Sequence, residues 1–298
     1  MGTIPKRDSV PIVAPTPTPF NENDEPDYDL MASNVHKWCS TSLSGFVLGS
    51  YGGEEFHLSD EEKLKLVQIV VDAHDGNKFV IAGIDTPSTR VACDLSEKYA
   101  KAGADMVRIR IPKLDQGKSS SAVVDYFETI SKQSPIPLIP IHQPKQPMDV
   151  DITHEQIGLI SEFESVYAYI ISLNYRWESR VSSFLDQKVQ LWTCNGTLLL
   201  PGALMGAEGA CLFYGNWAPD LCREIITLVK RGDIKKAQVI QESILQSDFI
   251  GMDRGVAALK AGLNLLGYET TVPRRPTKAL DEQEIEELKR ALKKADIL

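Results

Sequence analysis

Short apolar runs alternate with longer amphipathic segments along most of the chain. Eight of these runs have the length and composition of buried strands, and a helix-like segment follows each one. Strands that alternate with helices predict a parallel sheet with crossover helices. The strand-like runs are Val10–Ala14, Gly45–Gly49, Phe79–Ala82, Met106–Ile111, Pro137–Ile141, Val166–Ser172, Val189–Thr193 and Ala210–Phe213.

Two of the intervening helices carry a recognisable start signal. Ser59 is followed three residues later by Glu62, and Thr153 stands in the same relation to Gln156. Both pairs are typical of a capping box, in which each side chain bonds the backbone N–H of the other residue. We therefore expect helices to begin directly after Ser59 and Thr153.

Eight strand–helix units in 298 residues predict one closed (β/α)8 TIM barrel. The alternative is an open doubly wound sheet. The first strand is not followed by the Gly-x-Gly-x-x-Gly pattern of the dinucleotide-binding version of that fold, which weakens this alternative.

The chain stays helical after the eighth strand. Residues Asp220–Lys230, Ile234–Phe249, Arg254–Leu266 and Glu282–Lys294 are predicted helices. This tail is too long to be a single closing helix. We therefore divide the chain into a barrel core at residues 1–216 and, at 217–298, a closing helix with a C-terminal helical extension that packs beside the barrel or against another subunit.

Charge and composition argue against several classes of binding partner for this chain. The net charge is −9 and no dense basic cluster is present, which argues against nucleic acid and anionic membranes. No apolar run reaches the roughly 18 residues that span a bilayer, and the first residues lack the apolar core of a signal peptide. The five cysteines show no metal-like spacing. We expect a cytoplasmic protein with no metal and no organic cofactor.

Barrel enzymes place their sites where the strands end, so residues at those positions are the candidates. The loop that starts at Gly49 offers Ser50 and Tyr51 as a cradle for a carboxylate or phosphate; the alternative is a tight glycine turn. Arg108 and Arg110 alternate with aliphatic residues and share one face of the fourth strand. They either bind an anionic substrate or lie on the barrel exterior, and for Arg108 we favour the exterior.

Three further strand ends carry reactive or hydrogen-bonding groups. His142 follows the fifth strand and is a candidate acid–base group, with a structural hydrogen-bonded histidine as the alternative. Cys194 and Asn195 follow the seventh strand. The thiol is a possible nucleophile, although a small core residue is the simpler interpretation.

Several short pieces, in order along nearly the whole chain, resemble the dihydrodipicolinate synthase and N-acetylneuraminate lyase family. They are Thr16–Phe20, the glycine loop Gly49–Glu54, Val80–Gly83, Ala102–Asp105, Gly206–Gly209, Asn216 with Pro219, and Gly267 through Arg275–Pro276. The resemblance implies a (β/α)8 barrel with a C-terminal helical domain, assembled as a dimer or tetramer. It also implies aldolase or lyase chemistry on 2-oxo acids through a lysine Schiff base.

The residues that the resemblance assigns to that chemistry are replaced here. The Schiff-base lysine falls on Ser172, the catalytic tyrosine falls on His142, and a tyrosine pair falls on Lys113–Leu114. A serine has no amine that could condense with a ketone, so the usual electron sink is missing.

Three hypotheses remain open. The chain is an aldolase or lyase that uses another amine, for which Lys145 and Lys113 are candidates, or it acts on a 2-oxo acid or 3-deoxy-2-keto sugar acid by other chemistry. Alternatively, it is a catalytically degenerate member that binds a small carboxylate or partner without turnover. The sequence therefore leaves enzymatic activity open. The predicted site consists of Ser50, Tyr51, Arg110, His142, Ser172 and Asn195.

Overall fold

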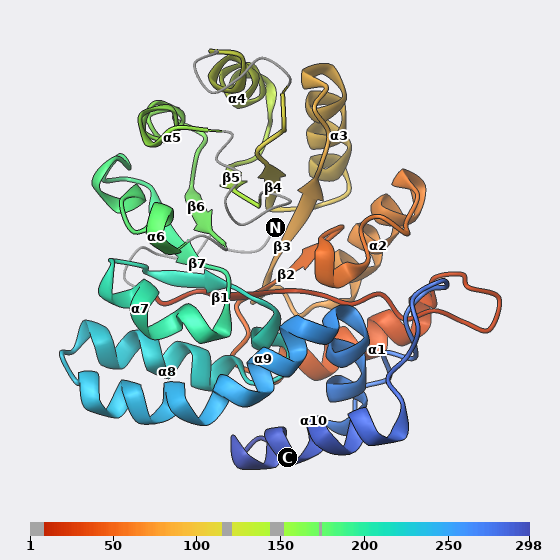
Figure 1. Ribbon diagram of the computed structural model, residues 1–298. Helices are drawn as coiled ribbons and strands as arrows, with labels where there is room; N and C mark the ends of the chain where they lie inside the picture. The colour runs from red at the N-terminus through yellow and green to blue at the C-terminus, as the bar shows by residue number, and fades with distance from the viewer. Residues whose placement is uncertain (1–8, 115–120, 144–151, 173–174) are drawn as a thin grey trace.

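The computed structural model describes residues 9–114, 121–143, 152–172 and 175–298. Eight parallel strands pair in sequence order, and β8 pairs with β1 to close the barrel. The predicted TIM barrel is confirmed, and the strands lie at the centre of a ring of helices (Figure 1). The strands are β1 Ile12–Pro15, β2 Gly45–Leu48, β3 Phe79–Ile84, β4 Met106–Arg110, β5 Leu138–Ile141, β6 Ala168–Ile171, β7 Gln190–Thr193 and β8 Gly209–Cys211.

The helices of the ring begin largely where local signals predict. Both capping boxes form, at Ser59 with Glu62 and at Thr153 with Gln156. The α-helices of the ring are α1 Tyr28–Cys39, α2 Asp60–Ala73, α3 Thr89–Lys101, α4 Ala122–Gln133, α5 His154–Ser161, α6 Tyr175–Glu178, α7 Leu199–Leu204 and α8 Pro219–Lys230. Short 3-10 turns are η1 Tyr51–Gly53, η2 Val181–Ser183, η3 Gly196–Leu198 and η4 Phe213–Asn216.

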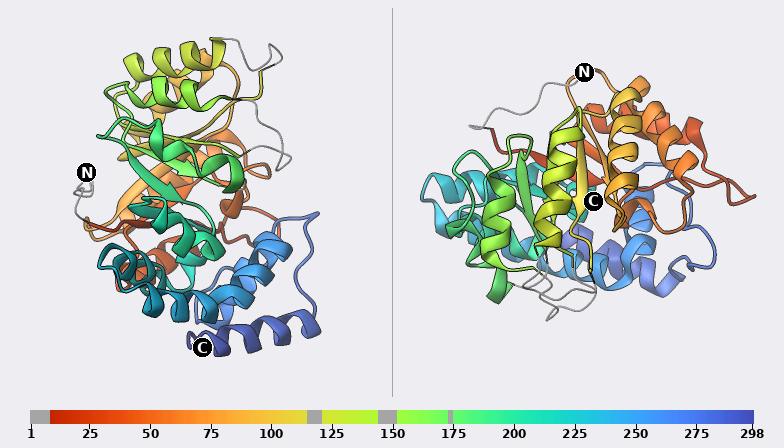
Figure 2. Two further views of the ribbon diagram at one scale, coloured as in Figure 1. Left: turned by 60° about the vertical axis from the view of Figure 1, so that its left-hand side comes forward. Right: turned by 90° about the horizontal axis from the view of Figure 1, so that it is seen from above.

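The C-terminal extension lies against one side of this ring. Helix α9 spans Ile234–Leu265 and contacts α8, η1 and η4, and α10 spans Glu282–Lys294 and packs on α9. Both turned views keep α9 and α10 on that side of the barrel (Figure 2). Two helices were predicted where α9 stands. The structure bears this out, because the backbone leaves the helical region at Gly255, whose φ of 58° and ψ of −140° suit a residue without a side chain. Helix α9 therefore consists of two helical segments joined at a kink, close to the predicted break between Phe249 and Arg254.

The barrel interior is filled by apolar side chains that alternate along each strand with those facing the helices. The inward-facing set forms a core cluster of its own: Val13, Val47, Phe79, Ile81, Met106, Ile139, Ile141, Ala168, Ile170, Trp192 and Cys211. Because successive residues of a strand point to opposite faces, this set fixes which later residues point into the barrel mouth. Within the described residues, no helix is long and apolar enough to cross a bilayer.

Candidate functional site

A cavity of about 460 Å³ opens at the C-terminal ends of the strands. Its walls come from seven of the eight strand ends or the loops that follow them, and from helix α9. This is the end of the barrel at which such folds place their ligands. The lining residues are Pro15, Val47, Ser50, Tyr51, Gly52, Phe56, Arg108, Arg110, Ile141, Gln143, Ser172, Cys194, Asn195, Cys211, Phe213 and Met252.

Two strands bring polar groups into this cavity because of their alternation. On β4, Met106 belongs to the inward-facing cluster, so Arg108 and Arg110 point inward as well. On β6, Ile170 is inward-facing and Ser172 therefore follows it into the mouth. Our preference for the barrel exterior at Arg108 was wrong, because this side chain lies inside the barrel and is 2% exposed.

Arg108 fits inside because the neighbouring strand has no side chain beside it. Gly83 on β3 pairs with Arg108 across the sheet. A Cβ atom at Gly83 would lie 2.9 Å from an Arg108 terminal nitrogen and 1.9 Å from the Gly49 carbonyl oxygen. Glycine is therefore required at this position.

The two arginines share one buried carboxylate. Arg108 donates to Glu55 at 3.0 Å, and Arg110 forms a short contact with the other oxygen of Glu55. Arg110 also lies 3.3 Å from Asp85, and Arg108 bonds the Gly49 carbonyl at 3.3 Å. Two cations and two carboxylates thus form a charge-balanced cluster below the mouth.

This cluster leaves two hydrogen-bond donors unused within the described structure. The Nε atoms of Arg108 and Arg110 are buried, and neither has a hydrogen-bond partner among the described residues. A buried donor without a partner costs about 1–3 kcal/mol. Both arginines line the cavity, so their guanidinium groups are the cations that a ligand bound there would meet.

Ser172 and Asn195 form a second polar corner. The Ser172 amide donates to Glu178 at 2.7 Å, and the Asn195 side chain donates to the Ser172 carbonyl. Cys194 lies beside them, and burial raises the pKa of its thiol to about 12. The thiol is therefore protonated near neutral pH, which favours the interpretation of Cys194 as a wall residue rather than a nucleophile.

Five residues of the predicted site line this cavity, and His142 does not. The reason is alternation again, since Ile141 points inward and the next residue points away from the mouth. The His142 ring is 1% exposed and packs on Trp177 with ring centroids 4.9 Å apart. Its assignment as an acid–base group stays a prediction. The predicted residues that do line it are Ser50, Tyr51, Arg110, Ser172 and Asn195, and Arg108 joins them from outside the predicted set.

None of the described residues that line the cavity is a lysine, a histidine or a carboxylate. Lys113 is exposed and is not part of the wall, and Lys145 lies outside the described residues. Across the described ranges, His, Cys, Asp and Glu side chains form no group of three or more suited to a metal ion.

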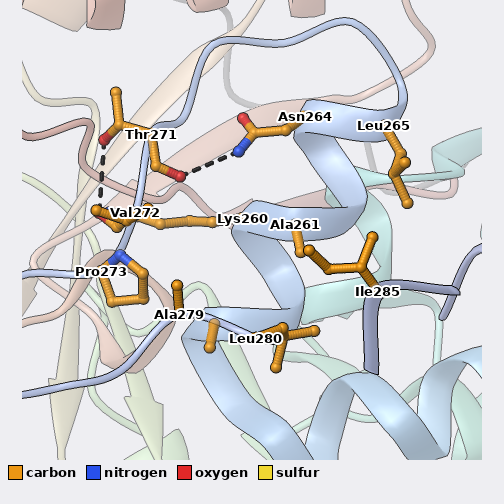
Figure 3. A pocket seen from close by; sticks show the side chains of 11 residues that line it. Lys260, Ala261, Asn264, Leu265, Thr271, Val272, Pro273, Ala279, Leu280 and Ile285 are labelled. Carbon is orange, nitrogen blue, oxygen red and sulfur yellow. Dashed lines mark hydrogen bonds between the residues drawn. The ribbon is translucent and has the colours of Figure 1, made fainter. Parts of the chain in front are cut away.

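A second, smaller cavity of about 270 Å³ lies outside the barrel, between α9 and the segment that leads to α10. Its walls are mostly apolar, and the Lys260 side chain runs along them toward Val272 (Figure 3). Lys260 donates to the Val272 carbonyl at 2.8 Å and lies 2.8 Å from Glu54, so its charge is engaged by protein groups. The Lys260 ammonium therefore differs from the Arg108 and Arg110 side chains of the barrel mouth, whose Nε atoms have no hydrogen-bond partner among the described residues.

The sequence profile of the dihydrodipicolinate synthetase family matches residues 9–295. The chain belongs to this family. Among curated relatives, a probable mitochondrial 4-hydroxy-2-oxoglutarate aldolase of Emericella nidulans is 25% identical over 94% of this chain and 93% of its own. A 4-hydroxy-tetrahydrodipicolinate synthase of Corynebacterium diphtheriae is 26% identical over 94% of this chain and 93% of its own.

Solved structures of the family share the fold. Dihydrodipicolinate synthase from Cyanidioschyzon merolae, with lysine bound, superposes with a TM-score of 0.89, at 22% identity, covering 98% of this chain and 100% of that one. The enzyme from Acinetobacter baumannii, complexed with pyruvate, gives 0.86 at 20% identity, covering 97% and 99%. The family resemblance drawn from scattered sequence pieces is thus confirmed, and the chain is a member of an aldolase and lyase family.

Proposed function

We propose that the barrel mouth binds a 2-oxo acid and cleaves it by aldolase or lyase chemistry that does not pass through a lysine iminium. The class includes 3-deoxy-2-keto sugar acids. The observation that carries the proposal is the pair of guanidinium groups, of Arg108 and Arg110, that line the cavity. A carboxylate or an enolate oxygen matches such donors in charge and geometry.

In this proposal the two arginines stabilise the negative charge that develops on the substrate during cleavage. In aldol cleavage the C4 hydroxyl passes its proton to water, because the described lining offers no lysine, histidine or carboxylate. The C3–C4 bond breaks, C4 leaves as an aldehyde, and the electron pair of the bond moves into an enolate with the charge on the C2 oxygen. A proton then adds to C3 to give the shorter 2-oxo acid. Donors fixed where charge develops lower the barrier, and loss of one such donor typically costs about 10²–10³-fold in rate.

A direct test measures pyruvate release from a panel of 4-hydroxy-2-oxo acids and 2-keto-3-deoxy sugar acids. Arg110→Gln is expected to lower kcat at least about 10²-fold, and Arg110→Lys to restore part of it, because an ammonium keeps the charge but not the planar donor pair. Arg90→Gln is the control, since Arg90 pairs with Asp94 on the exposed face of α3.

Two results would overturn the proposal. One is borohydride trapping of a pyruvate adduct on a lysine of the wild-type protein, which would restore the iminium route through Lys113 or Lys145. The other is the absence of both turnover and pyruvate binding, measured by calorimetry.

The second candidate function is ligand binding without turnover. It is favoured by the described walls of the cavity, which hold no imidazole, amine or carboxylate that would exchange a proton near neutral pH. Calorimetric binding of pyruvate that is lost in Arg110→Gln, together with no pyruvate release from any panel member, would support this alternative.

A further inference from the structure

The opening of the barrel-mouth cavity carries three large apolar side chains that are exposed. Phe56 is 67% exposed, Tyr51 is 56% exposed and Met252 is 40% exposed, and all three line the cavity. They come from two separate elements, the loop around η1 and helix α9. Large apolar groups gathered at one opening mark a place where apolar surface of another molecule is buried.

This apolar rim, defined as Tyr51, Phe56 and Met252, continues into the same cavity that ends at the arginines. Buried Phe213 and Ile141 extend its apolar walls inward. The polar groups gather at the inner end, where Arg108 is 2% exposed. The cavity therefore has a charged, hydrogen-bonding inner end and an apolar outer end.

One contact orients the rim. The Arg110 guanidinium lies over the Phe56 ring, 5.4 Å from its centroid. A cation over a ring face attracts the ring and favours that orientation of it. Because Phe56 is still mostly exposed, most of its surface remains available at the opening. Met252, with its flexible thioether, can adapt to the shape of what binds there.

We propose that the apolar rim selects 2-oxo acids whose distal end is an aromatic or branched aliphatic group, in preference to a polyhydroxylated chain. This inference rests on the proposed function, because it places the oxo-acid end of the ligand at the arginines. The rim offers a hydroxylated chain only the Tyr51 hydroxyl in exchange for the several water contacts it would lose, whereas an apolar group gains buried area against all three side chains.

The test uses binding, so that it does not depend on turnover. Calorimetry compares pyruvate, 2-oxo-4-phenylbutanoate and 2-keto-3-deoxygluconate. The phenyl compound is expected to bind at least tenfold more tightly than pyruvate, since each buried methylene contributes about fourfold. The sugar acid is expected to gain less than threefold over pyruvate.

A rim variant and a matched control locate the effect. Phe56→Ser is expected to reduce the ratio of phenylbutanoate to pyruvate affinity at least fivefold. Phe249→Ser is the control, because Phe249 is 64% exposed on α9 but does not line the cavity. It is expected to leave that ratio unchanged.

The outcomes separate the two proposals. If pyruvate does not bind and no 2-oxo acid of the panel is cleaved, the proposed function fails. If pyruvate binds and the phenyl compound shows no gain, or Phe56→Ser leaves the ratio intact, the selection of apolar substrates is wrong and the function stands. A rim that serves a second copy of the chain instead would show as a fall in mass by light scattering in Phe56→Ser, with the affinity ratio unchanged.

Discussion

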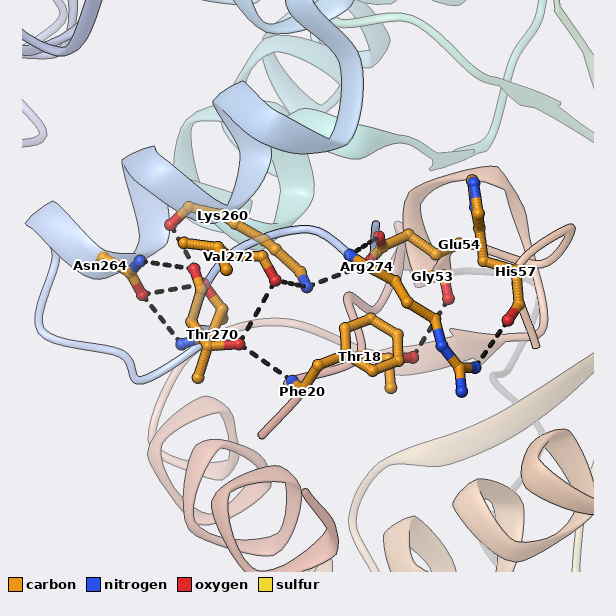
Figure 4. Close-up of polar contacts among 11 residues, drawn as sticks. Thr18, Phe20, Gly53, Glu54, His57, Lys260, Asn264, Thr270, Val272 and Arg274 are labelled. Atoms are coloured by element: carbon orange, nitrogen blue, oxygen red, sulfur yellow. Dashed lines mark hydrogen bonds and ion pairs between the residues drawn. The ribbon is translucent and has the colours of Figure 1, made fainter. Parts of the chain in front are cut away.

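Glu54 and Glu55 are adjacent in sequence and equally buried, yet they belong to two different regions. Glu55 joins Arg108 and Arg110 at the barrel mouth. Glu54 points to the C-terminal extension, where it lies 2.8 Å from Lys260 and accepts a bond from the Arg274 amide at 2.8 Å (Figure 4). The left-handed backbone of Glu54, with φ of 63°, is the turn at which the two carboxylates separate.

The two regions differ in how many hydrogen-bond donors of their cationic side chains are bonded to other protein groups. Lys260 bonds the Val272 carbonyl, pairs with Glu54 and lies 4.5 Å from the centroid of the Phe20 ring. The arginines at the mouth keep buried donors without partners among the described residues. A cation fully engaged by protein groups holds segments together, and one with spare donors is available to a ligand. We call the Glu54–Lys260 pair and Arg274 the latch.

The largest effect is expected from breaking the latch. Lys260→Met leaves the Glu54 carboxylate buried and unpaired, and should lower the free energy of unfolding by about 3–5 kcal/mol, measured by urea denaturation. The double variant Lys260→Met/Glu54→Gln should recover much of this loss. Lys101→Met removes an exposed pair with Glu97 and should cost less than about 1 kcal/mol. A small loss for Lys260→Met would show that the latch is not structural.

The next effect is the pH dependence of the latch. Burial lowers the pKa of Lys260 from 10.5 to about 8, and Glu54 opposes that shift. The unfolded chain then holds more protons than the folded one between pH 8 and 10.5, so this group adds stability as the pH rises through that range. Relative to the double variant, the wild type should gain at most about 3 kcal/mol. If the difference in free energy of unfolding between the wild type and the double variant stays constant or falls from pH 8 to 10.5, the lowered pKa of Lys260 is wrong.

The smallest effect is a change in pyruvate affinity at the barrel mouth. It is expected when Glu55 is replaced and not when Glu54 is replaced. Glu55→Gln removes the carboxylate that competes with a ligand for Arg110, so pyruvate should bind roughly tenfold more tightly. This corresponds to about 1.4 kcal/mol, a size expected for unit charges roughly 10 Å apart in an effective dielectric of about 20. Glu54→Gln should leave pyruvate affinity unchanged in calorimetry. Equal effects of the two variants would remove the distinction between the regions.

Most of the fold could be predicted from the sequence because its signals are local. Alternating apolar runs indicated the eight strands, and Ser59 with Glu62 marked a helix start that forms as expected. Two helices were predicted over α9, and its backbone does leave the helical region at Gly255, just after the predicted start of the second helix at Arg254.

The site was harder to predict from the sequence than the fold, because its geometry depends on which face of each strand points into the barrel. Alternation showed that Arg108 and Arg110 share a face, but both faces of a barrel strand are buried, so the pattern does not say which one points inward. The structure settles it, because Met106 belongs to the inward-facing cluster and both arginines share its parity. The same parity removes His142 from the cavity wall. Glu55 and Lys260 went unnoticed because their partners are distant in sequence.

The apolar interior beneath Arg108 gives the mouth a floor, since large side chains such as Trp192 and Ile139 fill the barrel there. A ligand that enters acid end first must leave by the way it came. In a cleavage reaction the outer fragment therefore departs before the inner one can follow. Kinetics should then show the shorter oxo acid as the last product off, competing directly with incoming substrate.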